Sequence, residues 1–250
     1  MNFLNKIFNG NTLYYPGCLT KFAALDLEKK NKNLLNKIGI EFITLSDLEL
    51  CCGSPILRAG YLDEFKKIAQ QNNQIFINHG VSRIITNCPA CFKMFGKDYP
   101  AALGDQWKIS VKHTSQIFYQ ALLEKRLKLN LRYGKVTYHD PCHLGRQMHI
   151  YDEPRALIEA CGYELIEMKF NRKESYCCGG GGGAQTNNPE LASEIAKERI
   201  NQAQETQAEI LCTACPMCYL HLQRNMQNKK FKVIELIELI EDSANYGKSE

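Results

Sequence analysis

The chain has 250 residues, of which 44% are hydrophobic and 23% charged, and its formal net charge is +4. This suits one large soluble domain or two of about 125 residues, and lysines and arginines scattered among acids argue against a nucleic-acid partner. No apolar run approaches the roughly 20 residues that span a bilayer, and residues 1–17 lack the order of a signal peptide, so we expect a cytoplasmic protein without a transmembrane segment.

Strands and helices are expected to alternate from the start of the chain. Residues 1–11 carry a short apolar stripe, from Phe3 to Phe8, that suits a docking surface. In the first half the expected strands cover residues 12–15, 40–45, 84–86 and 109–111. The expected helices run from 20 to 38, from about 63 to 80 and from about 114 to 128, and Gly39 ends the first of them.

The second half repeats this order. Its expected strands cover residues 135–139, 165–168, 209–211 and 231–234. Its expected helices run from Pro154 to Gly162, from the Asn188 cap to about 208, and onward from the last strand. The alternation predicts an α/β fold of two pseudo-symmetric repeats, each a small parallel sheet flanked by helices. We place the two lobes at residues 12–130 and 134–245.

Ten of the twelve cysteines recur in one order in both halves. The first set is Cys18, Cys51, Cys52, Cys88 and Cys91, and the second is Cys142, Cys177, Cys178, Cys215 and Cys218. Matched members are 124 to 127 residues apart, so the chain is one unit written twice. Each patterned cysteine follows a predicted strand, and parallel strands end at one edge of their sheet. We therefore expect each lobe to gather five thiols at the carboxyl ends of its strands.

This many cysteines in an unsecreted chain indicate metal rather than disulfides. A disulfide between the neighbours Cys51 and Cys52, or Cys177 and Cys178, would also need a strained ring. Zinc takes four ligands, commonly as two Cys-x-x-Cys pairs, whereas each lobe offers one such pair and three further thiols. Iron with inorganic sulfide takes more thiolates in a larger volume, so iron–sulfur clusters are favoured and zinc is the alternative.

Glycine follows both double cysteines, as Gly53 in the first half and as a run that begins with Gly179 and Gly180 in the second. These three glycines are expected to bring backbone N–H groups close to the cofactor, where only glycine leaves space. A phosphate-binding loop is the alternative for the run, because a helix follows it. Two cysteines at its head disfavour that alternative.

The Cys…Cys-Cys-Gly…Cys-x-x-Cys order, present twice, resembles the paired cysteine-rich (CCG) domains of heterodisulfide reductase, both of its B-type subunits and of its fused D-type subunits. It is also similar to iron–sulfur subunits of glycolate- and lactate-oxidising complexes. The most similar stretches are residues 138–146, 177–183 and 215–218, and the resemblance covers Tyr14 to about Leu222.

The resemblance implies two non-cubane [4Fe-4S] clusters, each bound by one set of five cysteines, that cleave a small-molecule disulfide by single-electron transfers. Cys142, Cys177, Cys178 and His143 are the catalytic candidates. Nothing before Cys18 matches the ferredoxin region of the fused D type. Electrons are therefore expected from a ferredoxin-like iron–sulfur subunit or a flavoprotein, and any membrane association would be peripheral and through a partner.

His139 and His143 have no counterparts in the first lobe, where Tyr15 and Leu19 stand. A histidine with a pKa near neutral could supply the protons that disulfide reduction consumes. A hydrogen bond from the strand end to the backbone is the alternative. Cys161 and Cys212 fall outside the repeated pattern, and we expect them to pack in the core.

Two other functions stay open at this stage. An electron-relay subunit of a hydroxyacid-oxidising complex would hold the same clusters, although the intact first cysteine set favours disulfide reduction. A non-catalytic scaffold with bound zinc or iron is the other.

Overall fold

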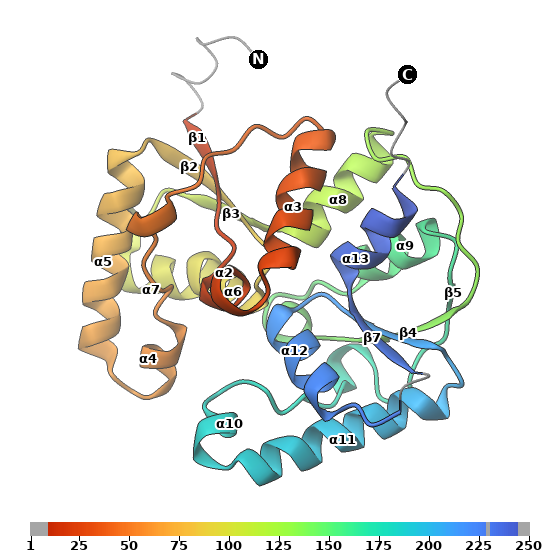
Figure 1. The fold of residues 1–250 in the computed structure, drawn as a ribbon. Coiled ribbons are helices and arrows are strands. Elements are labelled where there is room, and N and C mark those ends of the chain that lie inside the picture. Colours follow the sequence, from red (N-terminus) through yellow and green to blue (C-terminus); the bar gives the residue numbers. More distant parts are fainter. Residues whose placement is uncertain (1–9, 229–230, 245–250) are drawn as a thin grey trace.

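The computed structural model describes residues 10–228 and 231–244, and Figure 1 shows their arrangement. The stripe from Phe3 to Phe8 that was predicted to dock lies outside the described residues. The α/β prediction is confirmed, because helices flank two parallel sheets of three and four strands. None of the helices that the described residues form combines the length and apolar character needed to cross a membrane.

The first sheet has the strand order β1-β2-β3. Its strands are β1 (Asn11–Tyr14), β2 (Val81–Thr86) and β3 (Ser110–His113). The helices of this half are α2 (Cys18–Ala23), α3 (Leu25–Lys37), α4 (Ser54–Arg58), α5 (Leu62–Asn78), α6 (Pro89–Lys93), α7 (Tyr99–Leu103) and α8 (Thr114–Leu123). Shorter turns are η1 (Ser46–Leu48) and η3 (Gly104–Gln106), both 3₁₀, and the π-helical η2 (Met94–Asp98).

The second sheet has the strand order β5-β4-β6-β7. Its strands are β4 (Lys135–His139), β5 (Glu164–Leu165), β6 (Ile210–Thr213) and β7 (Lys232–Glu235). The helices of this half are α9 (Asp152–Ala160), α10 (Ala184–Asn187), α11 (Pro189–Glu205), α12 (Pro216–Asn225) and α13 (Leu236–Ser243). Its shorter turns are the π-helical η4 (His143–Gln147) and the 3₁₀ turn η5 (Arg172–Glu174).

The two sheets repeat one topology. Leu13 of β1 forms a parallel bridge with Ile43, which takes the place beside β1 that β5 takes beside β4. The last three residues of β2 and of β6 are buried, as expected for central strands covered on both faces. His113 and Glu235 end the equivalent strands β3 and β7, and both form capping boxes on the helices that follow.

Several predicted elements differ from the structure, among them the strand expected at 165–168, which is the shorter β5, and the helix expected to reach about 128, which is α8 and ends at Leu123. The strand expected at residues 40–45 is reduced to the single bridge at Ile43. The helix expected from 20 to 38 is divided at Ala24 (φ −142°, ψ 53°) into α2 and α3. Thr20 of α2 accepts a hydrogen bond from the Asn87 side chain at 3.1 Å, whereas Leu35 of α3 packs in a core at the junction of the two halves. The two helices have different neighbours, which periodicity alone does not reveal.

That core is shared by both halves. It contains Leu35 and Phe118 from the first half and Leu157 and Ile237 from the second. α3 packs against α13, and α8 packs against α9 (Figure 1). Because α3 and α9 occupy equivalent places, as do α8 and α13, an approximate two-fold axis relates these two contacts. The shared core therefore fixes the halves relative to each other, and the lobe boundaries at 12–130 and 134–245 stay a prediction.

Gly39 and Gly162 follow the equivalent helices α3 and α9, and both have positive φ, 74° and 90°. A Cβ on Gly162 would lie 2.5 Å from the Arg132 carbonyl oxygen, whereas one on Gly39 would meet nothing within 4 Å. We expect Gly39→Ala to lower the free energy of unfolding by ~1–2 kcal/mol, for the left-handed backbone alone. Gly162→Ala should lower it by ~2–4 kcal/mol, because the chain at Arg132 must also shift. Urea denaturation measures both, and equal losses would contradict this account of the packing.

Candidate metal centres

The first set of cysteines converges at the carboxyl ends of β1 and β2. Cys18 begins α2, and Cys88 and Cys91 lie at the start of α6. Cys51 and Cys52 come from the loop between η1 and α4. The Sγ atoms of Cys91 and Cys52 are 3.5 Å apart, and thiol hydrogen bonds also join Cys18 to Cys51, Cys51 to Cys52, and Cys88 to Cys91. All five thiols therefore form one connected group.

The second set forms the same group at the ends of β4 and β6. The Sγ atoms of Cys178 and Cys218 are 3.1 Å apart. Thiol hydrogen bonds join Cys142 to Cys177, Cys177 to Cys178, and Cys215 to Cys218, which are the equivalent pairs. All twelve cysteines of the chain are free. The structure thus brings together each set as the sequence predicts, and it contains no disulfide.

In both sets, hydrogen bonds between neighbouring thiols lower the pKa of one cysteine and raise the pKa of another. Hydrogen bonds from Cys18 and Cys52 lower the pKa of Cys51 to about 2. Hydrogen bonds from Cys142 and Cys178 likewise hold the pKa of Cys177 far below its ordinary value. The hydrogen bond between Cys142 and Cys177 also raises the pKa of Cys142. The first member of each double cysteine is therefore the thiolate that its neighbours stabilise. A cation that replaced the shared protons would bind all five sulfurs.

Each set extends from the core to the surface. The buried members are Cys52, Cys91, Cys178, Cys215 and Cys218, and the exposed members are Cys18, Cys51 and Cys177. Cys88 and Cys142 are half-buried. A cofactor held by such a set is enclosed on one side and reachable on the other.

The glycines after the double cysteines serve the thiols through the backbone. Gly53 and Gly179 have φ of 82° and 81°, and their N–H groups donate to Cys51 Sγ at 3.5 Å and to Cys177 Sγ at 3.4 Å. The N–H of Gly180 donates to Cys178 Sγ at 3.4 Å. The predicted N–H groups are therefore present.

The space that these glycines leave is filled by protein. A Cβ on Gly179 would lie 2.6 Å from the Ala192 carbonyl oxygen, and one on Gly53 would lie 3.0 Å from the Phe65 ring. Gly17, which sequence reasoning missed, is the glycine that faces thiols, since its Cβ would lie 3.0 Å from Cys91 Sγ. The Pro-Gly turn before Cys18 was the signal for it.

His143 joins the two halves beside the second set. Its Nδ1 lies 3.5 Å from Cys142 Sγ, and its Nε2 contacts the Arg58 guanidinium at the end of α4. Because a guanidinium only donates, Nε2 accepts and the ring proton is on Nδ1. Burial, with Arg58 and then Lys93, lowers the pKa of His143 to about 4, so the ring is neutral near pH 7. Arg58 could not be predicted to lie here, because it follows the first double cysteine.

His139 ends β4 and is fully buried. Its Nδ1 accepts a hydrogen bond from Arg199 Nε at 3.1 Å, so the alternative of a side-chain bond to the backbone is wrong. A ring nitrogen of His139 lies within 4.8 Å of the Sγ atoms of both Cys178 and Cys218. Burial and the Arg199 charge hold the pKa of His139 well below its ordinary range, so this ring is not a source of protons near pH 7.

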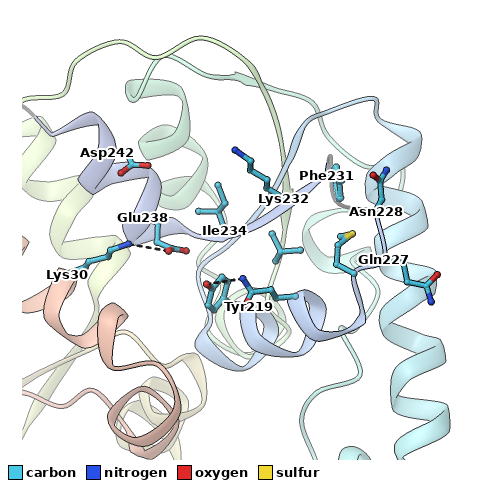
Figure 2. Close-up of a pocket in the computed structure, with 12 residues that line it drawn as sticks. Lys30, Tyr219, Gln227, Asn228, Phe231, Lys232, Ile234, Glu238 and Asp242 are labelled. Atoms are coloured by element: carbon cyan, nitrogen blue, oxygen red, sulfur yellow. Dashed lines mark hydrogen bonds and ion pairs between the residues drawn. The ribbon is translucent and has the colours of Figure 1, made fainter.

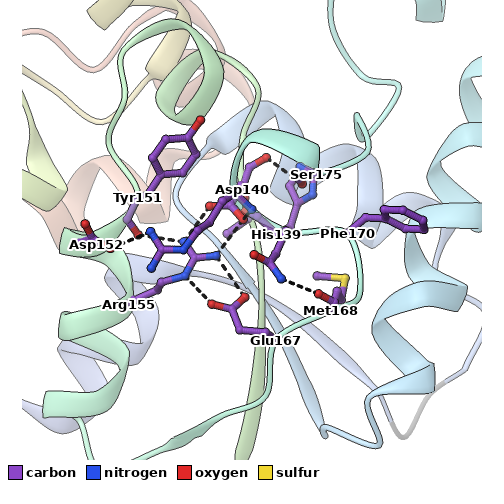
Figure 3. A network of polar contacts seen from close by, with 12 residues as sticks. His139, Asp140, Tyr151, Asp152, Arg155, Glu167, Met168, Phe170 and Ser175 are labelled. Carbon is purple, nitrogen blue, oxygen red and sulfur yellow. Dashed lines mark hydrogen bonds and ion pairs between the residues drawn. The ribbon is translucent and has the colours of Figure 1, made fainter.

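A buried ion-pair network holds the turn that leads to Cys142 (Figure 3). Arg155 donates to both carboxylate oxygens of Asp140 at 2.7 and 2.9 Å and also pairs with Glu167. The backbone N–H of Arg172 donates to Asp140 at 2.7 Å. Asp140 is therefore bound to Arg155, while Arg146 donates to the Ser175 carbonyl oxygen.

Segments that carry the two thiol sets contact each other across the halves. α6, which carries Cys91, packs against η4, which follows Cys142. The equivalent contact joins α12, which carries Cys218, to α2, which begins at Cys18. The approximate two-fold axis therefore relates the sites as well as the helices. The predicted core residues Cys161 and Cys212 lie away from the sets, fully buried in the shared core.

A cavity of about 420 Å³ lies elsewhere, between β7 and α12 (Figure 2). Tyr219 and Phe231 contribute to its wall, and Lys30 pairs with Glu238 at 3.2 Å at its edge. No patterned cysteine lines it. The thiol sets, rather than this cavity, are the candidate site.

Comparisons with known proteins agree with the repeat along the chain. The model of the cysteine-rich domain family (CCG) matches residues 12–96 and 136–223, one match in each half. The D-type subunit of dihydromethanophenazine:CoB–CoM heterodisulfide reductase from Methanosarcina acetivorans is 32% identical over 92% of this chain and 58% of its own length. The B-type subunit of fumarate reductase (CoM/CoB) from Methanothermobacter marburgensis is 30% identical over 91% of this chain and 45% of its own.

A third relative has a different activity in its name. EtfAB:quinone oxidoreductase of Syntrophomonas wolfei is 34% identical over 82% of this chain and 30% of its own length. The chain spans 58 to 60% of the length of the heterodisulfide reductase subunits that it matches.

Arg155→Met should strongly destabilise the second half. It leaves Asp140, whose side chain is 2% exposed, buried without its counter-charge, and breaking a buried pair in this way costs ~3–5 kcal/mol. Arg172→Met is the control, because its pair with Asp152 is exposed and should contribute at most ~1 kcal/mol. Chemical denaturation of the metal-free chains measures both, and a loss below about 1 kcal/mol for Arg155→Met would show that the network is not needed.

Proposed function

The chain belongs to the cysteine-rich (CCG) domain family, and on that premise we propose that it is an iron–sulfur oxidoreductase subunit of the heterodisulfide reductase kind. Each half would bind one non-cubane [4Fe-4S] cluster. The first would be held by Cys18, Cys51, Cys52, Cys88 and Cys91, and the second by Cys142, Cys177, Cys178, Cys215 and Cys218. The observation that carries the proposal is that both sets of five thiols form one connected group with equivalent contacts and no disulfide.

The donor atoms fit such a cofactor. Soft thiolates are the ligands that iron–sulfur clusters require, and the thiolate form is already favoured at Cys51 and Cys177. N–H groups of Gly53 and Gly179 donate to those same sulfurs, as expected around a negatively charged cluster. When bound, the clusters would supply single electrons. A zinc ion fits less well, because it would use four of five thiols that are all in contact.

The substrate would be a disulfide that binds between the halves. Reduction breaks the sulfur–sulfur bond with two electrons and two protons, and it releases two thiols. The packing of α6 on η4 supports a site at this junction, where Cys142 and Cys177 would face the substrate, while the buried Cys178, the third catalytic candidate, would hold the cluster from behind. His143 carries its proton on Nδ1, 3.5 Å from Cys142 Sγ, and Arg58 keeps it there. In this role the neutral His143 ring would donate a hydrogen bond from Nδ1 and position that sulfur.

Electrons would come from a partner. A ferredoxin-like iron–sulfur subunit or a flavoprotein is the donor that we propose, in the cytoplasm, with membrane association only through that partner. The relatives whose names mark them as subunits support an assembly of this kind.

One comparison favours a second function. The 34% identity to EtfAB:quinone oxidoreductase supports an electron relay between a flavoprotein and a quinone, built on the same two clusters. The relay needs no disulfide, so the two functions differ in substrate and not in cofactor.

Iron analysis tests the clusters. The anaerobically purified chain should hold about eight irons, and Cys178→Ala should reduce this to about four, because it removes one of five ligands from the second set. Cys212→Ala is the control, since Cys212 is equally buried but belongs to neither set. Zinc in place of iron, or an iron content that Cys178→Ala leaves unchanged, would exclude the proposed assignment.

Activity separates the two functions. With a chemical reductant, the loaded protein should reduce a low-molecular-weight disulfide and release two thiols per two electrons. His143→Phe should slow this reaction by about tenfold to a hundredfold, because it removes the Nδ1–H donor beside Cys142 Sγ, while the iron content is kept. The reaction is measured as the number of thiols released per electron taken up. Oxidation of the reduced clusters by a quinone, without any thiol release from disulfides, would identify the relay instead.

A further inference from the structure

Arg199 of α11 is a buried cation without a carboxylate partner. It is fully buried, and its guanidinium donates to His139 Nδ1 at 3.1 Å, the Phe170 carbonyl oxygen at 2.9 Å, Gln202 Oε1 at 2.8 Å and Ser175 Oγ at 3.0 Å. All four acceptors are uncharged. In the described part of the chain no ion pair reaches Arg199, and burying a charge in this way is strongly unfavourable unless a counter-charge is supplied.

The charge on Arg199 determines the tautomer of His139. Burial lowers the pKa of Arg199 to about 10, so the guanidinium stays protonated near pH 7. A protonated guanidinium can only donate, hence Nδ1 of His139 has no proton and the neutral ring carries it on Nε2. That Nε2 is buried and has no hydrogen-bond partner among the described residues. The ring therefore offers one unused N–H donor.

The His139 ring lies beside sulfur. A ring nitrogen of His139 lies within 4.8 Å of the Sγ atoms of both Cys178 and Cys218. A nitrogen that carries a proton cannot bind a metal ion through its lone pair, but it can donate to a thiolate or a sulfide. The ring is therefore suited to donate a hydrogen bond toward the second thiol set rather than to act as an additional ligand.

The first half has no such device. Tyr15 stands in the place of His139, and its hydroxyl donates to the Leu50 carbonyl oxygen at 2.6 Å. Asn72, on the equivalent helix α5, donates to the Cys51 carbonyl oxygen at 3.0 Å. Both neutral side chains thus donate to backbone carbonyl oxygens of the loop that contains Cys51. Among the described residues the fully buried arginine is on the second half alone.

We propose that Arg199 and His139 form a buried cationic pair that supplies positive charge and a hydrogen bond to the second thiol set. The cluster of that set then has the higher reduction potential. This rests on the proposed iron–sulfur function. Reduction adds negative charge, and both the cation and the donor stabilise the reduced state. When both clusters are bound, an electron from a ferredoxin-like donor that reached the first would pass on to the second, which would be reduced as the first was oxidised. Both His139 and Arg199 are positioning residues in this scheme.

A redox titration of the full chain, followed by electron paramagnetic resonance, tests the proposal. Cys52→Ala and Cys178→Ala chains, each with one cluster, assign the signals to the halves. We expect the second cluster to be reduced first. Arg199→Gln and His139→Phe should each lower the reduction potential of the second cluster by ~59 mV, which is a tenfold change in the equilibrium for a one-electron couple. Tyr15→Phe, the matched change in the first half, should leave the second cluster's potential unchanged.

Equal potentials in the wild-type chain, or a second cluster whose potential Arg199→Gln leaves unchanged at full iron content, would overturn the proposal. If either variant fails to fold, the order of the two wild-type potentials decides, and a first cluster that is reduced first overturns it. Fewer than about eight irons in the wild-type chain would instead refute the proposed function. In the metal-free protein, nitrogen-15 NMR should find the His139 proton on Nε2, and a proton on Nδ1 would overturn the proposal.

Discussion

The apolar core shared by the two halves is the interaction on which both thiol sites depend. α3 packs against α13 and α8 against α9, and these two contacts are related by an approximate two-fold axis. The same axis sets α6 on η4 and α12 on α2, so each Cys-x-x-Cys helix contacts the segment that begins at the other half's first cysteine. The segments that carry the sites therefore contact each other because the helices behind them are packed. A repeat that folded as two separate cores would lose that relation.

Each half adds a core of its own around its sulfurs. Cys52 and Cys91 pack within an apolar cluster of the first half, and Cys178, Cys215 and Cys218 pack within one of the second. The buried thiols are thus held in place before any metal is bound, which lowers the entropy cost of closing a site. The exposed Cys51 and Cys177 are held differently, by the left-handed turns at Gly53 and Gly179. Apolar packing and backbone donors together determine the geometry of each set.

Features set by local or repeated pattern could be predicted from the sequence. β4 covers the predicted residues 135–139, and both cysteine sets gather where the strand ends place them. Contacts between distant residues could not be predicted. Nothing near Arg58 in the sequence indicates that it reaches His143, and nothing near Arg199 indicates that it donates to His139. The break at Ala24 belongs to the same class, because Asn87, which anchors α2, lies 67 residues after Thr20.

The two halves keep equivalent thiols but differ in the residues behind them, and this difference affects stability as well as redox chemistry. In the metal-free protein the Arg199 charge is buried among uncharged acceptors, which weakens the second half. An anionic cofactor would remove that penalty, so the second half gains more from loading than the first, where Tyr15 and Asn72 are neutral and already bonded. A cofactor that binds only the folded protein stabilises it. Occupancy of the second site is therefore coupled to folding more strongly than occupancy of the first. The residue that raises the electron affinity of this half also makes its fold depend on the cofactor.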